Sequence, residues 1–167
     1  MIILTGGFPG SGKSYFAKRL AAKIDAVWLS SDGVRKVLNA TGKYKFDDKM
    51  LVYNELARLS ELHVKESRSV IVDATFSHKS MRDLFTSLAG KLSVPLRFIW
   101  VYANEELIRE RLQKPREDSE ADFAVYQKIR DQFEPINIPA ARIESTKNNV
   151  ESMLRIAKQF INGNEGR

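Results

Sequence analysis

The feature that most constrains this chain is the stretch 7–14, GFPGSGKS. It matches the pattern GxxxxGK[ST] at every fixed position. A short apolar run at 2–4 precedes it, and apolar residues follow it at the spacing of one helix face. The sequence therefore predicts a strand, a tight glycine-rich turn and a helix in direct succession, the context in which this pattern forms a phosphate-binding loop (P-loop).

The residue types in this turn suit the triphosphate of a nucleotide. Glycines let the backbone turn tightly and direct its N–H groups at phosphate oxygens, and the following helix adds the positive end of its dipole. Lys13 is expected to reach the β- and γ-phosphates and Ser14 to ligate Mg²⁺, while Pro9 has no N–H to donate. A glycine-rich turn that ends in Lys-Ser by chance is the alternative, and the flanking strand and helix argue against it. We predict that ATP and Mg²⁺ bind at Gly7, Phe8, Pro9, Gly10, Ser11, Gly12, Lys13, Ser14 and Tyr15.

Length and composition limit the class of protein. A chain of 167 residues with 43% hydrophobic and 29% charged residues is predicted to form one globular domain over 1–167. The lack of cysteine excludes disulfides, thiolate metal sites and a cysteine nucleophile. No signal peptide or membrane span is recognisable, so we expect a cytoplasmic enzyme.

The net charge of +6 is unevenly distributed. Residues 1–100 hold 16 Lys and Arg against 9 Asp and Glu, whereas residues 101–167 hold 11 against 12. The positive half carries the predicted phosphate-binding loop, which suits an anionic substrate. Dispersed lysines that serve solubility explain the same excess equally well, and charge alone does not establish nucleic-acid binding.

Apolar runs alternate with segments of helical periodicity, at 2–4, 26–29, 70–73, 96–102 and 141–145. Nearly continuous apolar runs indicate strands buried on both faces, and the alternation indicates a parallel sheet. We predict an α/β fold of the P-loop NTPase type, nucleotide-kinase-like, with a five-stranded parallel sheet and helices on both faces. The stretch 113–122 has no large apolar side chain, so it is either a solvated connection or a mobile lid.

Two aspartates follow strand-like runs, and ligands in such a sheet bind beyond the carboxyl ends of the strands. Asp73 is interpreted as the acid that holds the Mg²⁺ shell near Ser14; capping the next segment or pairing with a lysine are its alternatives. In a kinase, Asp32 would accept the proton of the acceptor hydroxyl, and Arg35 would hold an anionic part of the acceptor. Asp32 could instead cap the following helix, although the two serines before it are suited to that role.

Four aromatic residues have simpler interpretations. Trp28 and Trp100 lie in strand-like runs and are expected in the core. Tyr44 and Phe46 fall in the segment 39–48, which we expect to be a loop or insertion. They either stack on a base, as in single-strand binders, or anchor that loop.

Three motifs, at 7–14, 31–35 and 72–75, together resemble the small P-loop kinase group that includes polynucleotide 5′-hydroxyl kinases. The resemblance covers nearly the whole chain. It implies roles for five residues: a general base, an acceptor contact, a metal-linked acid and two groups near the acceptor, which are Asp32, Arg35, Asp73, Thr75 and Arg82.

The resemblance also implies a lid arginine that closes over the phosphates. Arg116 is assigned this role because it lies in the stretch 113–122, and Arg111 is its rival. One departure concerns the acceptor. Phe76 follows Asp-Ala-Thr where polynucleotide kinases of this group tend to have Asn, which argues against a polynucleotide acceptor and leaves ATP use untouched.

These patterns together predict an ATP- and Mg²⁺-dependent kinase whose acceptor is a small metabolite, a nucleoside or a 5′-hydroxyl polynucleotide. A nucleotide-switch protein is one alternative. It would want a guanine-reading Asn/Thr-Lys-x-Asp, and the nearest match, at 146–149, lacks the acid. A nucleic-acid-associated ATPase is another, supported by the basic first hundred residues but by no recognisable binding module.

Overall fold

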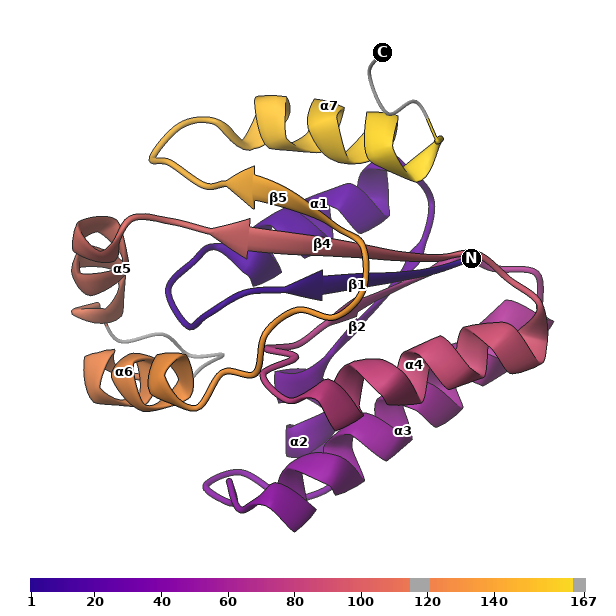
Figure 1. The fold of residues 1–167 in the computed structure, drawn as a ribbon, viewed down its shortest axis with the longest axis horizontal. Helices are drawn as coiled ribbons and strands as arrows, with labels where there is room; N and C mark the ends of the chain where they lie inside the picture. The colour runs from indigo at the N-terminus through magenta and orange to yellow at the C-terminus, as the bar shows by residue number, and fades with distance from the viewer. Residues whose placement is uncertain (115–120, 164–167) are drawn as a thin grey trace.

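Five parallel strands form one sheet in the computed structural model, which describes residues 1–114 and 121–163. The strand order is β2-β3-β1-β4-β5, and every neighbouring pair is parallel (Figure 1). The predicted five-stranded parallel sheet is therefore confirmed. In chain order the elements are β1 (Ile2–Gly6), α1 (Lys13–Lys23), β2 (Val27–Ser30), α2 (Ser31–Val37), α3 (Phe46–Lys65), β3 (Val70–Asp73), α4 (Lys79–Leu92), β4 (Leu96–Tyr102), α5 (Glu105–Leu112), α6 (Phe123–Asp131), β5 (Ala140–Glu144) and α7 (Val150–Ile161).

Helices cover both faces of the sheet, as the sequence predicts. α1 and α7 pack on one face and α3 and α4 on the other (Figure 1). The central strand β1 is fully buried and divides its side chains between the two layers: Ile3 packs with α1 and α7, whereas Ile2 and Leu4 pack with α3 and α4. This alternation follows from the two-residue period of a strand.

The strand register places three functional segments at one edge. Thr5 of β1 and Ser30 of β2 both pair with Asp73 of β3. The three strands therefore end at the same level. Because the strands are parallel, the P-loop after β1, the start of α2 after β2 and the end of β3 meet there.

Two sequence expectations differ from the structure. α3 begins at Phe46, so the last part of 39–48 is helical; Asp47 and Asp48 in its first turn favour a helix start. Trp100 is buried as predicted, whereas Trp28 is only partly buried and lines a cavity. Within 1–114 and 121–163, no helix combines the length and apolar character needed to cross a bilayer.

The predicted lid, 113–122, falls largely on residues 115–120, which lie outside the described part of the chain. α5 ends at Leu112 before it, and α6 begins at Phe123 after it. A lid role for this stretch stays a prediction.

Candidate active site

The turn between β1 and α1 has a conformation that glycine adopts readily. Gly10 has φ of +80° and Gly12 has φ of +89°, both in the left-handed region. Space is as limiting as the angle, because a Cβ on Gly12 would lie 2.9 Å from the Ser145 Oγ. The turn leads directly into the N-terminus of α1 at Lys13, where helix N–H groups and the helix dipole attract anions.

Arg111 of α5 stabilises this turn. Its Nη1 donates to the Gly10 carbonyl at 3.1 Å and to the Ser145 Oγ at 3.1 Å. Its Nη2 donates to the Thr146 carbonyl at 3.0 Å. The guanidinium of Arg111 therefore links the P-loop to the segment after β5. Its role as the lid arginine, considered as the rival of Arg116, stays a prediction.

Lys13, Ser14 and Asp73 form the base of the site. The Lys13 Nζ lies 3.4 Å from the Ser14 Oγ and 3.8 Å from the Asp73 Oδ1. The Asp73 side chain is 1% exposed, and neither of its oxygens has a hydrogen-bond donor within the described residues. A buried carboxylate without donors is costly, so the water shell of a cation would satisfy it.

This arrangement fits a magnesium ion held mainly by a nucleotide. Mg²⁺ keeps several waters and is usually bound through one or two protein groups plus substrate phosphates. The Ser14 hydroxyl and, through water, the Asp73 carboxylate would be such groups. No cluster of three His, Cys, Asp or Glu side chains suited to a metal ion occurs in the part of the chain that the structure describes.

Asp32 lies in the first turn of α2, and helix capping does not explain it. The N-cap of α2 is Ser30, whose Oγ accepts a hydrogen bond from the Gly33 N–H at 3.0 Å. Ser30 therefore has the capping role that was the alternative interpretation of Asp32. The Asp32 side chain lines the same cavity as Lys13 and Ser14.

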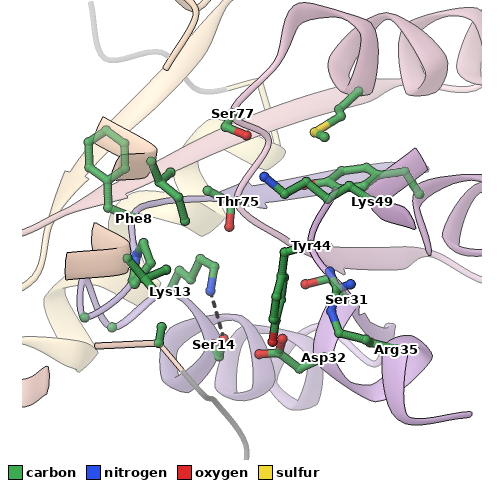
Figure 2. Close-up of a pocket in the computed structure, with 18 of the residues that line it drawn as sticks. Phe8, Lys13, Ser14, Ser31, Asp32, Arg35, Tyr44, Lys49, Thr75 and Ser77 are labelled. Atoms are coloured by element: carbon green, nitrogen blue, oxygen red, sulfur yellow. Dashed lines mark hydrogen bonds between the residues drawn. The ribbon is translucent and has the colours of Figure 1, made fainter. Parts of the chain in front are cut away.

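Arg35 lies one turn further along α2 and is largely buried. It is 8% exposed, its Nη1 donates to the Lys43 carbonyl at 3.0 Å, and its guanidinium carbon lies 4.7 Å from the centre of the Tyr44 ring. Figure 2 shows Tyr44 standing between Lys13 on one side and Arg35 on the other, with Asp32 at the end of its ring. Tyr44 therefore lines the cavity.

One cavity of about 680 Å³ brings most of the predicted site together. Its volume lies in the usual range for small-ligand sites, about 300–1,000 Å³. Gly7 and Ser11 belong to the P-loop but not to the cavity wall, and Asp73 lies buried beneath it. The predicted residues that line it are Phe8, Pro9, Gly10, Gly12, Lys13, Ser14, Tyr15, Asp32, Arg35 and Thr75.

The family described as AAA domain matches residues 2–136 of the chain. This protein belongs to the AAA domain family. Uncharacterized proteins of Mycobacterium tuberculosis and Mycobacterium bovis are each 32% identical to it over 101 residues, which is 53% of this chain and 20% of theirs. The matching stretch thus spans about a fifth of the length of these relatives.

Solved structures, two of them of kinases, share the fold of this AAA domain. A gluconokinase from Sinorhizobium meliloti 1021 has a TM-score of 0.72 at 16% identity over 93% of this chain and 87% of its own. The APS kinase CysC of Mycobacterium tuberculosis, in complex with AMPPNP and APS, has a TM-score of 0.73 at 17% identity over 96% of both chains. Kti12 of Chaetomium thermophilum, in complex with ADP-AlF3, has a TM-score of 0.70 at 16% identity over 99% of this chain and 100% of its own. The AAA domain therefore has a P-loop kinase fold, as the motifs predict.

Arg82 is a predicted site residue that does not line the cavity. It is fully buried, and its Nη1 donates to the Phe76 carbonyl at 2.7 Å. Its Nη2 donates to the carbonyls of Glu134 and Pro135 at 3.2 and 2.6 Å, and its Nε donates to the Asn137 Oδ1 at 3.0 Å. These bonds use the guanidinium to join the loop after β3 to the segment after α6, so the expected acceptor contact is corrected to a structural one.

The other assignments have mixed outcomes. Arg116 lies outside the described residues, so its lid role stays a prediction. Phe76 is fully buried, and its N–H donates to the Tyr53 Oη at 2.8 Å. Its side chain packs in the core of the AAA domain against the rings of Tyr53, Phe85 and Phe98, which explains an aromatic residue where a polar one was expected.

Sequence reasoning missed Lys18 and Arg19 of α1, which line the cavity. It also missed two lysines of later helices in the cavity wall, Lys49 of α3 and Lys128 of α6. Burial lowers the pKa of Lys49, and the positive charges of Lys128 and Arg35 lower it further. Lysines are common on exposed helix faces, so neither position carried a recognisable pattern. Lys49 and Lys128 line the same cavity only because α3 and α6 both pack beside the P-loop.

Proposed function

We propose that this protein is an ATP- and Mg²⁺-dependent kinase that transfers the γ-phosphate of ATP to a hydroxyl group. The observation that carries the proposal is the single cavity in which Lys13 and Ser14 face Asp32 and Arg35 (Figure 2). Binding a nucleotide requires the P-loop alone, whereas phosphate transfer to a hydroxyl also uses a carboxylate on the opposite side. The kinase fold of the gluconokinase and APS kinase structures supports the same reaction class.

On the acceptor side, the hydroxyl oxygen attacks the γ-phosphorus of ATP. The bond between that phosphorus and the oxygen that bridges to the β-phosphorus breaks, and ADP leaves. The Asp32 carboxylate accepts the hydroxyl proton, and Thr75 orients the acceptor from the opposite wall. The product is the phosphate ester of the acceptor.

On the nucleotide side, Lys13 and the N–H groups at the start of α1 stabilise the charge that develops on the phosphate oxygens. When bound, Mg²⁺ would supply further neutralisation of that charge. Ser14 and, through water, Asp73 are the residues that would hold it. Arg116 is proposed to complete this side from the stretch that follows α5.

The test is phosphate transfer from γ-labelled Mg·ATP to a panel of 5′-hydroxyl oligonucleotides, nucleosides, polyols and sugar derivatives. We expect Asp32→Asn to lower the transfer rate by about 10² to 10⁴ without changing nucleotide affinity. Lys13→Ala is expected to lower it by about 10² to 10³. Asp25→Asn, at an exposed aspartate outside the cavity, is the matched control and should leave the rate unchanged.

Two results would contradict the proposal. Transfer unchanged by Asp32→Asn would exclude Asp32 as the base. Nucleotide binding with no labelled acceptor, together with ATP hydrolysis raised only by DNA, RNA or a protein partner, would favour the nucleic-acid-associated ATPase or the nucleotide switch.

A further inference from the structure

Three cationic side chains from different helices line the cavity together. Arg35 comes from α2, Lys49 from α3 and Lys128 from α6. Arg35 is buried, Lys49 is partly buried and Lys128 is exposed at the cavity wall. Lys49 lies near enough to both Arg35 and Lys128 for their positive charges to repel its own.

No carboxylate within 1–114 and 121–163 forms an ion pair with this cluster of Arg35, Lys49 and Lys128. Asp32 is the sole carboxylate among the described residues of the cavity wall. Neighbouring positive charges without an anion destabilise a fold, which indicates that this cluster is completed by a bound anion.

The Arg35 guanidinium provides an independent indication. Its Nη1 is bonded to the Lys43 carbonyl, but its Nε has no acceptor within the described residues. Because Arg35 is only 8% exposed, water does not readily replace the missing acceptor. Arg35 also lines the cavity, and a planar guanidinium matches the geometry of a phosphate or carboxylate.

The triphosphate of ATP does not account for the cluster. The P-loop and Lys13 already provide the groups that bind the β- and γ-phosphates. Arg35 instead lies beside Asp32, across Tyr44 from Lys13 (Figure 2). An anion held by Arg35 therefore belongs to the molecule whose hydroxyl faces Asp32.

The cavity favours a small molecule over a polymer end. Its volume of about 680 Å³ is bounded by helices on several sides. Phe76, at the position where a polar residue is expected for a polynucleotide acceptor, is fully buried in the core. No side chain at that position is therefore available to contact a nucleic-acid strand.

We propose that the acceptor is a small anionic hydroxyl compound whose phosphate or carboxylate is bound by Arg35, Lys49 and Lys128 while its hydroxyl faces Asp32. This inference rests on the proposed function for the reaction at that hydroxyl. The anion subsite itself does not depend on the reaction. Its probe is therefore a simple anion, which needs no knowledge of the rest of the acceptor.

The experiment titrates inorganic phosphate into protein whose P-loop is saturated with Mg·AMPPNP, at constant ionic strength, and follows the lysine side-chain NMR signals. We expect the Lys49 and Lys128 signals to shift together, with a dissociation constant on the order of 1 to 10 mM. Lys49→Met and Lys128→Met should each weaken phosphate binding by about tenfold, the effect of one charge-assisted contact. A parallel titration with acetate distinguishes a phosphate subsite from a carboxylate subsite.

The control is Lys158→Met, an exposed lysine of α7 outside the cavity, which should bind phosphate as the wild type does. The melting temperature of Lys49→Met should equal or exceed that of the wild type, because a repelled, partly buried charge is removed. Absent shifts, equal losses in the control, or a lower melting temperature in Lys49→Met would each overturn the anion subsite. Efficient transfer to neutral hydroxyl compounds alone would overturn the assignment of an anionic acceptor and leave the kinase proposal intact. Anion binding without any transfer would support the anion subsite and contradict the kinase proposal.

Discussion

The nucleotide side and the acceptor side of the cavity are built in different ways. The nucleotide side is one continuous stretch, 7–14, whose shape is a property of its backbone. The acceptor side consists of side chains from α2, α3, α6 and the loop after β3. A binding site formed by the backbone tolerates few substitutions. A binding site formed by side chains from separate elements can acquire a different ligand by substitution while the fold stays the same.

Each side has its own arginine that bonds to main-chain carbonyls. Arg111 joins the P-loop to the segment after β5, and Arg82 joins the loop after β3 to the segment after α6. Both side chains act on the site through the backbone that they hold. Separate changes on the two sides should therefore have separable effects on nucleotide and acceptor.

The largest effect is expected from Arg82→Met. Four acceptors on the acceptor side lose their donor at a fully buried position, so the free energy of unfolding should fall by about 3 to 5 kcal/mol, measured by urea denaturation. Arg58→Met is the control, because Arg58 is exposed and pairs only with Glu55 of its own helix among the described residues. A stable Arg82→Met variant with a raised acceptor KM would show instead that Arg82 contacts the substrate.

Arg111→Met should break the nucleotide side selectively. Loss of its bonds to the Gly10 and Thr146 carbonyls loosens the P-loop, so the affinity for Mg·ATP should fall by about tenfold or more in calorimetric titration. Inorganic phosphate binding at the acceptor side should be unchanged. Arg109→Met, on the same helix without a P-loop contact in the described residues, should retain wild-type nucleotide affinity.

Tyr53→Phe tests the support of the acceptor side by stability and by pH. The buried Phe76 N–H loses its acceptor, which should cost about 1 to 3 kcal/mol. Burial raises the pKa of Tyr53 above its usual value near 10, so the folded state keeps a proton that the unfolded state releases. The contribution is therefore fully present below about pH 10 and is lost as pH rises through the folded pKa.

The measurement is the free energy of unfolding between neutral pH and pH 11. The wild type should lose stability above pH 10 more steeply than Tyr53→Phe does. Tyr102→Phe, at a more exposed tyrosine, should keep the wild-type alkaline slope. Equal slopes in all three proteins would show that Tyr53 ionises as freely in the folded state as in the unfolded state.

The smallest effects should come from two helix caps, one for each side. Ser30 caps α2, which carries Asp32 and Arg35, and Asn104 caps α5, which carries Arg111. Ser30→Ala and Asn104→Ala should each lower stability by about 1 kcal/mol. Ser30→Ala should raise the acceptor KM, and Asn104→Ala should weaken nucleotide binding. The reverse assignment in steady-state kinetics would contradict the division of the cavity into two sides.

Much of this structure is predictable because it depends on local pattern. Apolar runs and helical periodicity place all five strands, and the rule that ligands bind beyond strand carboxyl ends brings Asp32 and Asp73 to the P-loop. Arg82, assigned from the family resemblance, shows where that assignment disregarded the local pattern. It lies on the apolar face of α4, three residues before the buried Phe85, so the periodicity already indicated an inward side chain that a functional assignment overlooked.

The sequence by itself determined the P-loop and the parallel α/β fold, since both follow from short-range geometry: a contiguous glycine-rich turn and the periods of strands and helices. Only the tertiary structure decided that Arg111 and Arg82 hold the two sides of the cavity, and that Lys49 and Lys128 join Arg35 around it. Those side chains are far apart along the chain, and nothing in their local sequence records their neighbours. Their contacts arise when α3 and α6 pack beside the same edge of the sheet, because a charged group acquires its electrostatic role from the groups that surround it in space.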